Sequence, residues 1–202
     1  NGHLFLRPII QTSTVVGVPI PAIDSERCTL CGRCVELCAY HALAHLLDQI
    51  MVFAEICHSC GGCRLICPEQ AIAEEEREIG QIEQGTAHEV SLAQGRLRIG
   101  EAMAPPLIRR VLQTAVDTAD GIVIVDAPPG TSCSMIQSVR GSDLVILVTE
   151  PTPFGLHDLT LAADVIKELK LPFGVVINRC DTGGRRVHDY CAKEQIPTLI
   201  EI

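Results

Sequence analysis

The sequence predicts an α/β protein in which a parallel sheet is wrapped by helices and a small cysteine-rich α+β domain is inserted. Eight of the 11 cysteines fall in two short clusters in the first third of the chain. In the second half, short β-branched runs alternate with segments of helical spacing, the pattern of a parallel sheet. A chain of 202 residues with 47% hydrophobic and 3% aromatic residues has room for two units with aliphatic cores.

Charge and cysteine usage exclude several classes of function. The net charge is -9 and no dense Lys/Arg run occurs, which argues against a nucleic-acid partner. No stretch approaches the roughly 18 to 20 apolar residues of a membrane span, and no signal peptide is evident. Tightly clustered cysteines indicate metal rather than disulfides. We therefore expect a soluble, cytoplasmic, metal-binding protein.

The first third contains an internal duplication. Residues 28 to 43, "CTLCGRCVELCAYHAL", and residues 57 to 72, "CHSCGGCRLICPEQAI", superpose when shifted by 29 positions (57 − 28 = 29). Each copy has the spacing C-x2-C-x2-C-x3-C. Small residues such as Gly32, Gly61 and Gly62 would let backbone N–H groups approach the sulfides of a cluster.

Residues 22 to 76 resemble the two-cluster bacterial ferredoxin domain, in which three cysteines of a run hold one 4Fe-4S cluster and the fourth holds the other. The predicted ligands are Cys28, Cys31, Cys34 and Cys67 for the first cluster, and Cys57, Cys60, Cys63 and Cys38 for the second. The resemblance implies a β-hairpin with short helices that passes single electrons. Zinc, usually held by two C-x2-C pairs, is the alternative.

Three local features of this segment are less specific. Pro68 follows the last cysteine of the second run, whereas Ala39 stands at the equivalent place in the first, which weakens a turn but not the ligation. His58 either tunes a cluster or is a solvated loop residue. Because the domain is small, we expect the clusters to contribute to its folding.

The middle of the chain predicts a linker, a hairpin and a helix. The charge run "AEEEREIG", residues 73 to 80, is typical of a solvated domain boundary. "EVSLAQGRLRIG" alternates about Gly95 and predicts a hairpin. "PPLIRRVLQTAVDTA" has helical spacing with prolines at its start, and Arg109 and Arg110 are expected on its exposed face.

The last third predicts a parallel sheet buried on both faces. Its β-rich runs are "GIVIVD", "DLVILVT" and "FGVVIN", and the final "TLIEI" also has strand character. The clearest helix spans residues 155 to 170, with an apolar stripe of Leu156, Leu159, Ala163, Ile166 and Leu169. Because sites in such sheets lie beyond the C-terminal strand ends, we expect Asp126, Glu150 and Asn178 to converge on one crevice.

The segments "VDAPPGTSC", "VTEPTPFGLHDL" and "VVINRCD" resemble the MinD/ParA-type P-loop ATPases, in particular the branch with an inserted ferredoxin domain. The resemblance covers nearly the whole chain. It implies that Asp126 holds Mg²⁺ through water and that Gly130 faces the γ-phosphate. Asn178 would hydrogen-bond adenine, and Pro128 and Pro129 would shape the nucleotide turn. ATP and Mg²⁺ join the two clusters as expected cofactors.

The phosphate-binding loop G-x4-G-K-[ST] of that family does not occur, because the three lysines, Lys167, Lys170 and Lys193, do not follow a glycine. "NGHLFLRP" at the start resembles the segment after the second strand of the family fold. We therefore expect the middle of a longer ATPase, with parts of the ATPase domain at residues 1–21 and 77–202 and the insert at 22–76. A degenerate pseudo-ATPase is the alternative.

The leading functional hypothesis is an iron-sulfur ATPase that couples ATP binding and hydrolysis to electron transfer or metallocofactor assembly. Its partner would be a redox or cofactor-assembly protein, and it would work as a homodimer or beside a similar ATPase. One alternative is a ferredoxin-type carrier with an inactive α/β docking scaffold. The other alternative is an amide ligase similar to cobyrinic acid a,c-diamide synthase. Such an enzyme needs a nucleophilic cysteine on a tight, usually glycine-flanked turn paired with a histidine, and Cys133, Cys180 and Cys191 lack that setting.

Overall fold

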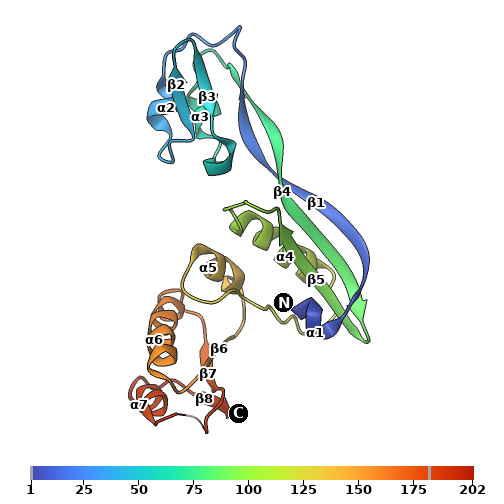
Figure 1. The fold of residues 1–202 in the computed structure, drawn as a ribbon, viewed down its shortest axis with the longest axis vertical. Helices are drawn as coiled ribbons and strands as arrows, with labels where there is room; N and C mark the ends of the chain where they lie inside the picture. Colours follow the sequence, from blue (N-terminus) through green and yellow to red (C-terminus); the bar gives the residue numbers. More distant parts are fainter. Residues whose placement is uncertain (1, 182) are drawn as a thin grey trace. The chain divides into compact units, whose positions relative to one another are not determined.

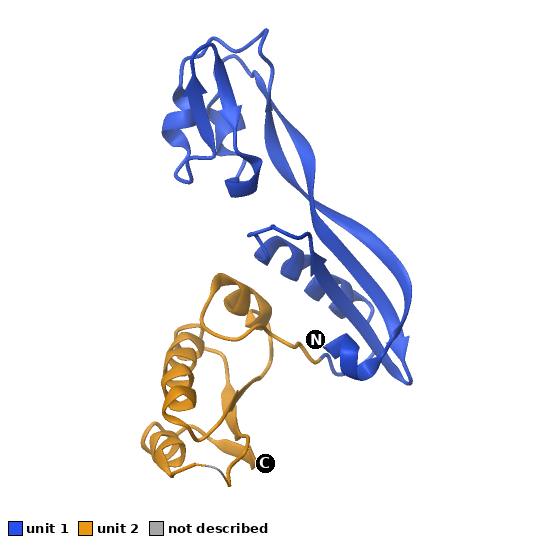
Figure 2. Ribbon diagram, viewed as in Figure 1, with its two compact units in different colours: residues 1–123 blue, residues 124–202 orange. Residues whose placement is uncertain are grey.

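The computed structural model describes residues 2–181 and 183–202, which fall into two compact units. Unit 1 is Asn1–Val123 and unit 2 is Ile124–Ile202 (Figure 2). This division differs from the sequence boundaries, because residues 77–123 lie in the same unit as the cysteine-rich segment.

Unit 1 is built on a long antiparallel sheet with the order β1-β4-β5. A short helix, α1 (Gly2–Leu6), leads into β1 (Ile9–Ile23), which pairs along its length with β4 (Ile72–Ala87). β5 (Val90–Leu97) pairs with the C-terminal half of β4. Figure 1 shows β1 and β4 as a twisted ribbon with the cysteine-rich segment at one end. The chain therefore enters and leaves that segment as two paired strands.

The helix α4 (Pro105–Asp117) covers one face of this sheet. Leu107 is 3% exposed and packs on Ile79 and Ile82 of β4, with Val16 and Val18 of β1 completing the core. Arg109 and Arg110 are exposed on the opposite side of the helix, as predicted. The predicted helix is thus confirmed, and its buried side packs on an aliphatic core.

Two expectations for this region are wrong. Residues 73–80 are not a boundary but the first half of β4, and their last two members, Ile79 and Gly80, are buried. The glutamates of the run are exposed and Arg77 is largely buried, and the backbone pairs with β1 except at Ile79, where the register shifts. The hairpin also does not turn at Gly95, which lies inside β5; the turn connects Ala87 to Val90. A Cβ atom at Gly95 would lie 2.9 Å from Val111, so glycine is required by the close approach of α4.

The cysteine-rich segment is a β-hairpin with short helices, as predicted. The hairpin is β2 (Leu43–Leu46) paired with β3 (Gln49–Val52). The helices α2 (Arg33–Leu37) and α3 (Gly62–Ile66) lie at equivalent places of the two repeats and contact one another, and a 3-10 turn, η1 (Ala54–Ile56), precedes the second repeat.

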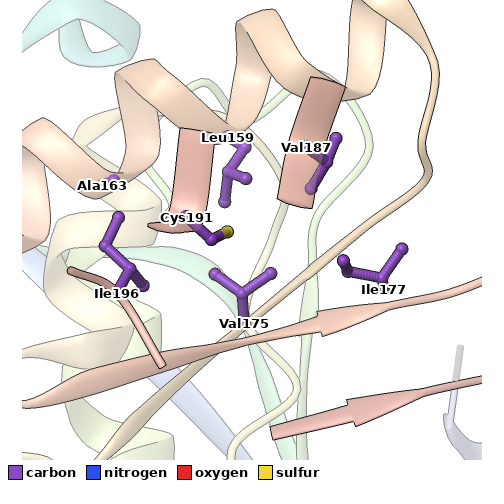
Figure 3. Packing of buried hydrophobic residues seen from close by; sticks show 7 residues of the cluster. All are labelled: Leu159, Ala163, Val175, Ile177, Val187, Cys191 and Ile196. Carbon is purple, nitrogen blue, oxygen red and sulfur yellow. The ribbon is translucent and has the colours of Figure 1, made fainter. Parts of the chain in front are cut away.

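Unit 2 contains a parallel three-stranded sheet with the order β6-β7-β8. Its strands are β6 (Val145–Thr149), β7 (Phe173–Ile177) and β8 (Thr198–Glu201), and its helices are α5 (Cys133–Val139), α6 (Pro153–Glu168) and α7 (Arg186–Lys193). In Figure 3, Leu159 and Ala163 of α6 and Val187 and Cys191 of α7 point toward Val175 of β7. The final "TLIEI" and the predicted helix at 155–170 are confirmed.

The expectation of strands buried on both faces is wrong for the described residues. Val145 and Thr149 of β6 face the helices and are buried, whereas Ile146 and Val148 alternate with them and are 53% and 67% exposed. The run "GIVIVD" is also not a strand, and Ile124 is 90% exposed. β-branched residues form a strand only where a neighbouring edge takes up their backbone hydrogen bonds, and no described segment does so here.

Candidate metal centres and a polar cavity

The eight clustered cysteines line two cavities in crossed groups. One cavity, of about 20 Å³, is lined by Cys28, Cys31, Cys34 and Cys67. The other, of about 240 Å³, is lined by Cys38, Cys57, Cys60 and Cys63, with Cys34 also at its wall. These are the two sets predicted from the spacing. The fourth cysteine of each run therefore lies beside the first three of the other run.

Left-handed glycines shape the two cysteine loops. Gly32 has φ 75° and Gly61 has φ 70°, and each caps the start of the short helix that carries the third cysteine. Non-glycine residues rarely adopt this conformation, so glycine allows the sharp reversal that turns three thiols toward one point. The duplication therefore extends from the sequence to the backbone.

Backbone N–H groups donate to sulfur at matching places in the two repeats. The N–H of Ala42 donates to Sγ of Cys38 and that of Ala71 to Sγ of Cys67, each at 3.3 Å. The N–H of Ser59 donates to Sγ of Cys57 at 3.4 Å. Such bonds stabilise negative charge on sulfur and tune the reduction potential of an iron-sulfur centre.

The third cysteine of each run lies among apolar groups. Burial raises the pKa of Cys34, and the nearby thiols of Cys28 and Cys31 raise it further. The pKa of Cys63 is raised in the same way, by burial first and then by Cys57 and Cys60. Thiols that lie together in apolar surroundings are poor anions by themselves, so a bound cationic group favours their joint deprotonation.

The donor set fits iron-sulfur clusters better than zinc. The eight cysteines form two sets of four around two separate cavities. Zinc requires four ligands around one ion, each at about 2.0 to 2.3 Å. A 4Fe-4S cluster binds its four thiolates through different iron atoms, so the wider placement around a cavity suits it.

A pair of stacked rings borders the larger cavity. The rings of Tyr40 and His58 have centroids 3.4 Å apart and planes 6° from parallel, and both residues line the cavity. Tyr40 follows Cys38 by two positions and His58 follows Cys57 directly. Sequence reasoning named His58 alone; the repeat alignment could not show that Tyr40 from the other loop would lie on it.

In unit 2 the predicted nucleotide residues line a third cavity, of about 760 Å³. Asp126, Pro128, Pro129 and Gly130 form one wall, and Glu150 and Asn178 lie at the ends of β6 and β7, so the expected convergence on one crevice is observed. Gly130 has φ 86°, a left-handed turn that favours glycine.

Two threonines missed by the sequence analysis fix the turn after β6. Oγ1 of Thr149 donates to the carbonyl of Gly155 at 2.9 Å, and the N–H of Gly155 donates to Oγ1 of Thr152 at 3.0 Å, which caps α6. A capping threonine before Pro153 was the available sequence signal.

The charge of this third cavity is negative. Asp126, Glu150 and Asp158 line it, and its described lining contains no Lys, Arg or His. Nη1 of Arg179 lies 3.6 Å from Oε1 of Glu150 and partly offsets that carboxylate. A polyphosphate would therefore need an additional cation here, such as Mg²⁺ or a lysine from a phosphate-binding loop.

The cysteines outside the clusters do not form a nucleophilic site. Cys191 is 1% exposed and burial raises its pKa, which disfavours the reactive thiolate. Cys180 is half-buried against the same core, and Cys133 is exposed at the start of the seven-residue α5. Among the described residues, none of the three is hydrogen-bonded to a histidine.

Comparisons with known proteins agree with the first two sites. Residues 27–72 match the family described as 4Fe-4S dicluster domain. The chain is 27% identical over 144 residues to an uncharacterized protein of Methanocaldococcus jannaschii, MJ0579, covering 71% of this chain and 52% of that protein. A second uncharacterized protein of that organism, MJ0578, is 28% identical over 155 residues, or 77% of this chain and 54% of the relative. The chain thus spans about half the length of the curated relatives it matches.

The domain match supports iron-sulfur binding and an electron-transfer role for residues 27–72. Among the described helices, none combines the length and apolar character needed to cross a membrane. The relation to a P-loop ATPase rests on sequence motifs alone.

Proposed function

We propose that unit 1 relays single electrons through two 4Fe-4S clusters with crossed ligation, Cys28, Cys31, Cys34 and Cys67 holding one and Cys57, Cys60, Cys63 and Cys38 the other. The observation that carries this proposal is the grouping of these two sets around two separate cavities. The crossed fourth cysteines would fix both clusters to both halves of the segment.

The protein's own residues would set how these clusters behave. A bound cluster supplies a site that accepts and releases one electron without a proton or a bond change. The cysteines hold it in place, and the N–H groups of Ala42, Ser59 and Ala71 stabilise the added negative charge. Leu43, Ile50 and Ile72 pack against the cysteines and limit water. Four fixed cysteines for each cluster favour relay over cluster delivery, which needs labile ligands.

Cysteine-to-serine variants test which cysteines bind the same cluster. Cys38→Ser is expected to alter the same electron paramagnetic resonance signal as Cys60→Ser, and Cys67→Ser the same signal as Cys31→Ser. The wild-type protein, purified without oxygen, is expected to contain about eight irons and eight sulfides. Pairing of Cys38→Ser with Cys31→Ser would exclude the crossed arrangement, and about two metal ions without sulfide would establish zinc.

We further propose that unit 2 is the nucleotide-binding part of an iron-sulfur ATPase, in which Asp126 holds Mg²⁺ through water and Asn178 contacts adenine. The convergence of these residues with Gly130 on one cavity supports the proposal. The free edge of β6 supports it as well, because among the described strands β6 pairs with β7 alone. A further parallel strand that carries a phosphate-binding loop would pair with this edge and bring a lysine to the cavity.

Equilibrium dialysis of the intact protein with ATP and Mg²⁺ tests this second proposal. Saturable binding that is weakened about tenfold or more by Asn178→Ala, and by Asp126→Asn only in the presence of Mg²⁺, would support it. Asp189→Asn, in α7 and outside the cavity lining, is the matched control. Absence of binding by the intact protein would leave the alternative of an electron carrier with an inactive α/β docking scaffold.

A further inference from the structure

The two halves of the cluster-binding segment differ at two pairs of equivalent positions that line the cavities. Adding 29 to Tyr40 gives Glu69, and subtracting 29 from His58 gives Thr29. All four side chains line the cavity of their own cysteine set, Tyr40 and His58 the larger one and Thr29 and Glu69 the smaller one. The duplication therefore places a ring stack beside one proposed cluster and a hydroxyl with a carboxylate beside the other.

The surface around the ring stack is apolar and solvent-exposed. Tyr40 is 48% exposed and Leu37, which also lines the cavity, is 51% exposed. His58 is exposed as well, and Pro19 and Pro21 of β1 complete the apolar wall. The equivalent rim of the smaller cavity instead carries the exposed side chains of Arg33 and Glu69. Aromatic residues at the centre of an exposed patch are typical of protein interfaces.

Acidic residues lie in or next to the elements that form this apolar centre. Glu74 lines the cavity, Glu36 lies next to Leu37 in α2, and Glu55 lies two positions before Cys57 in η1; all three are exposed. Nη1 of Arg64 pairs with Oε2 of Glu74 at 3.0 Å and offsets one of these charges. Residues 22–76 carry nine Asp or Glu and three Arg, so the segment as a whole is negative and a partner with a basic rim would be attracted to it.

We propose that the face formed by Tyr40, His58 and Leu37 is where a redox partner protein with a basic rim docks to exchange electrons with the Cys38, Cys57, Cys60, Cys63 cluster. This inference rests on the proposed electron-transfer function. Flat rings that stack across the two loops give a rigid contact surface with little loss of side-chain freedom on docking. Water is excluded between the partner and the cavity, and the cluster beneath is separated from the partner by a few side chains.

The test uses cytochrome c, a basic haem protein, as the probe. One electron passes from the reduced protein to ferric haem, which becomes ferrous, while the protein returns to its oxidised form; no bond forms or breaks. The protein is reduced with a stoichiometric amount of dithionite, and haem reduction is followed by stopped-flow absorbance at low and high salt. In a parallel experiment, oxidised methyl viologen replaces cytochrome c as the electron acceptor. This dye is too small to need a docking face.

The double variant Tyr40→Thr/His58→Thr removes the ring stack without adding charge, and His45→Thr/Leu46→Thr, at two exposed positions of β2 that line neither cavity, is the matched control. We expect the first variant to slow haem reduction about tenfold while the rate with methyl viologen changes by no more than about twofold. The control should retain the wild-type rate, and high salt should slow haem reduction by the wild type, because salt screens the attraction between acidic side chains and the basic haem protein.

Three outcomes would overturn the proposal. Equal slowing by both double variants would mean that the effect is not specific to the ring stack. An unchanged rate in the first variant would mean that the partner docks elsewhere. A wild-type dimer that becomes a monomer in the first variant, measured by sedimentation, would assign the face to a second copy of the chain. Iron content and the resonance spectra, measured on every sample, separate these results from a failure of cluster binding itself.

Discussion

Arg77 donates a hydrogen bond from Nη1 to Oε2 of Glu101 and so ties β4 to the loop that follows β5. The side chain of Glu101 is 2% exposed and that of Arg77 is 16% exposed. The other carboxylate oxygen, Oε1, accepts the N–H of Met103 at 2.9 Å. This ion pair fixes the chain just before α4, the helix whose Leu107 fills the core of the sheet.

We expect Glu101→Ala to destabilise the protein by about 3 kcal/mol or more, because removal of one partner leaves the other charge buried. The free energy of unfolding in denaturant, followed by circular dichroism, measures the effect. Glu74→Ala removes the exposed pair with Arg64 and should change stability by less than about 1 kcal/mol. Equal effects of the two variants would mean that the Arg77–Glu101 pair contributes no more than a surface pair.

The same pair predicts a dependence of stability on pH. Burial by itself would raise the pKa of Glu101, but the hydrogen bonds from Arg77 and Met103 and the charge of Arg77 outweigh it and hold the pKa below its usual value. A carboxyl whose pKa is lower in the folded state stabilises the fold above its unfolded pKa of about 4.3, and this contribution is lost as the pH falls through the folded value.

The stability difference between wild type and Glu101→Gln should therefore be constant from pH 7 to about pH 5 and should shrink below about pH 4. Unfolding of the two proteins in the same buffers, with iron content measured at each pH, cancels the effect of acid on the clusters. A difference that grows as the pH falls would show that the pKa of Glu101 is raised rather than lowered.

Local spacing predicted the helices and the cysteine loops, whereas pairing between distant segments was not predictable from composition. The apolar stripe of α6 and the prolines before α4 are local signals, and both helices form as expected. The run at residues 73–80 has the composition of a linker, but Val18 pairs with Arg77 across a distance of 59 positions (77 − 18 = 59). Such a polar segment forms a strand only because a distant partner strand takes up its backbone hydrogen bonds.

The candidate sites show the same distinction between local and distant information. The grouping of the cysteines is implied by the repeat spacing together with the resemblance to two-cluster ferredoxins, so it could be predicted from the sequence. The stacking of His58 on Tyr40 depends on how loops from the two repeats meet, and the place of Asp158 in the third cavity depends on the packing of α6. "GIVIVD" was misjudged because β propensity does not provide the neighbouring edge that a strand requires.

Replacement of Gly95 tests the close packing of α4 on β5. Valine has a higher β propensity than glycine, an advantage of at most about 1 kcal/mol. Its Cβ atom would lie 2.9 Å from Cγ2 of Val111 and 3.1 Å from Cδ2 of Leu107, and such overpacking costs about 1 to 3 kcal/mol. We expect Gly95→Val to lower the free energy of unfolding of the protein, as measured in denaturant.

Gly121→Ala is the control for that experiment, because no atom lies within 4 Å of a Cβ built there. It should change stability by no more than about 0.5 kcal/mol. If Gly95→Val stabilised the protein, strand propensity would outweigh the contact with α4, and the glycine would not be explained by packing.

Removal of the clusters is expected to unfold the cysteine-rich segment and leave unit 2 intact. The small core of that segment, Leu43, Ile50 and Ile72, is completed by the buried Cys34 and by partly buried cysteines, so loss of the metal leaves these thiols around open space. The core of unit 2, with Val175 and Ile177 fully buried, contains no predicted ligand.

Hydrogen exchange of the whole chain, before and after anaerobic chelation, should show lost protection in peptides from residues 27–72. Peptides from α6 and β7 should keep theirs, since their hydrogen bonds and apolar contacts lie within unit 2. Retained protection at residues 27–72 after complete iron loss would mean that the hairpin and short helices fold without metal.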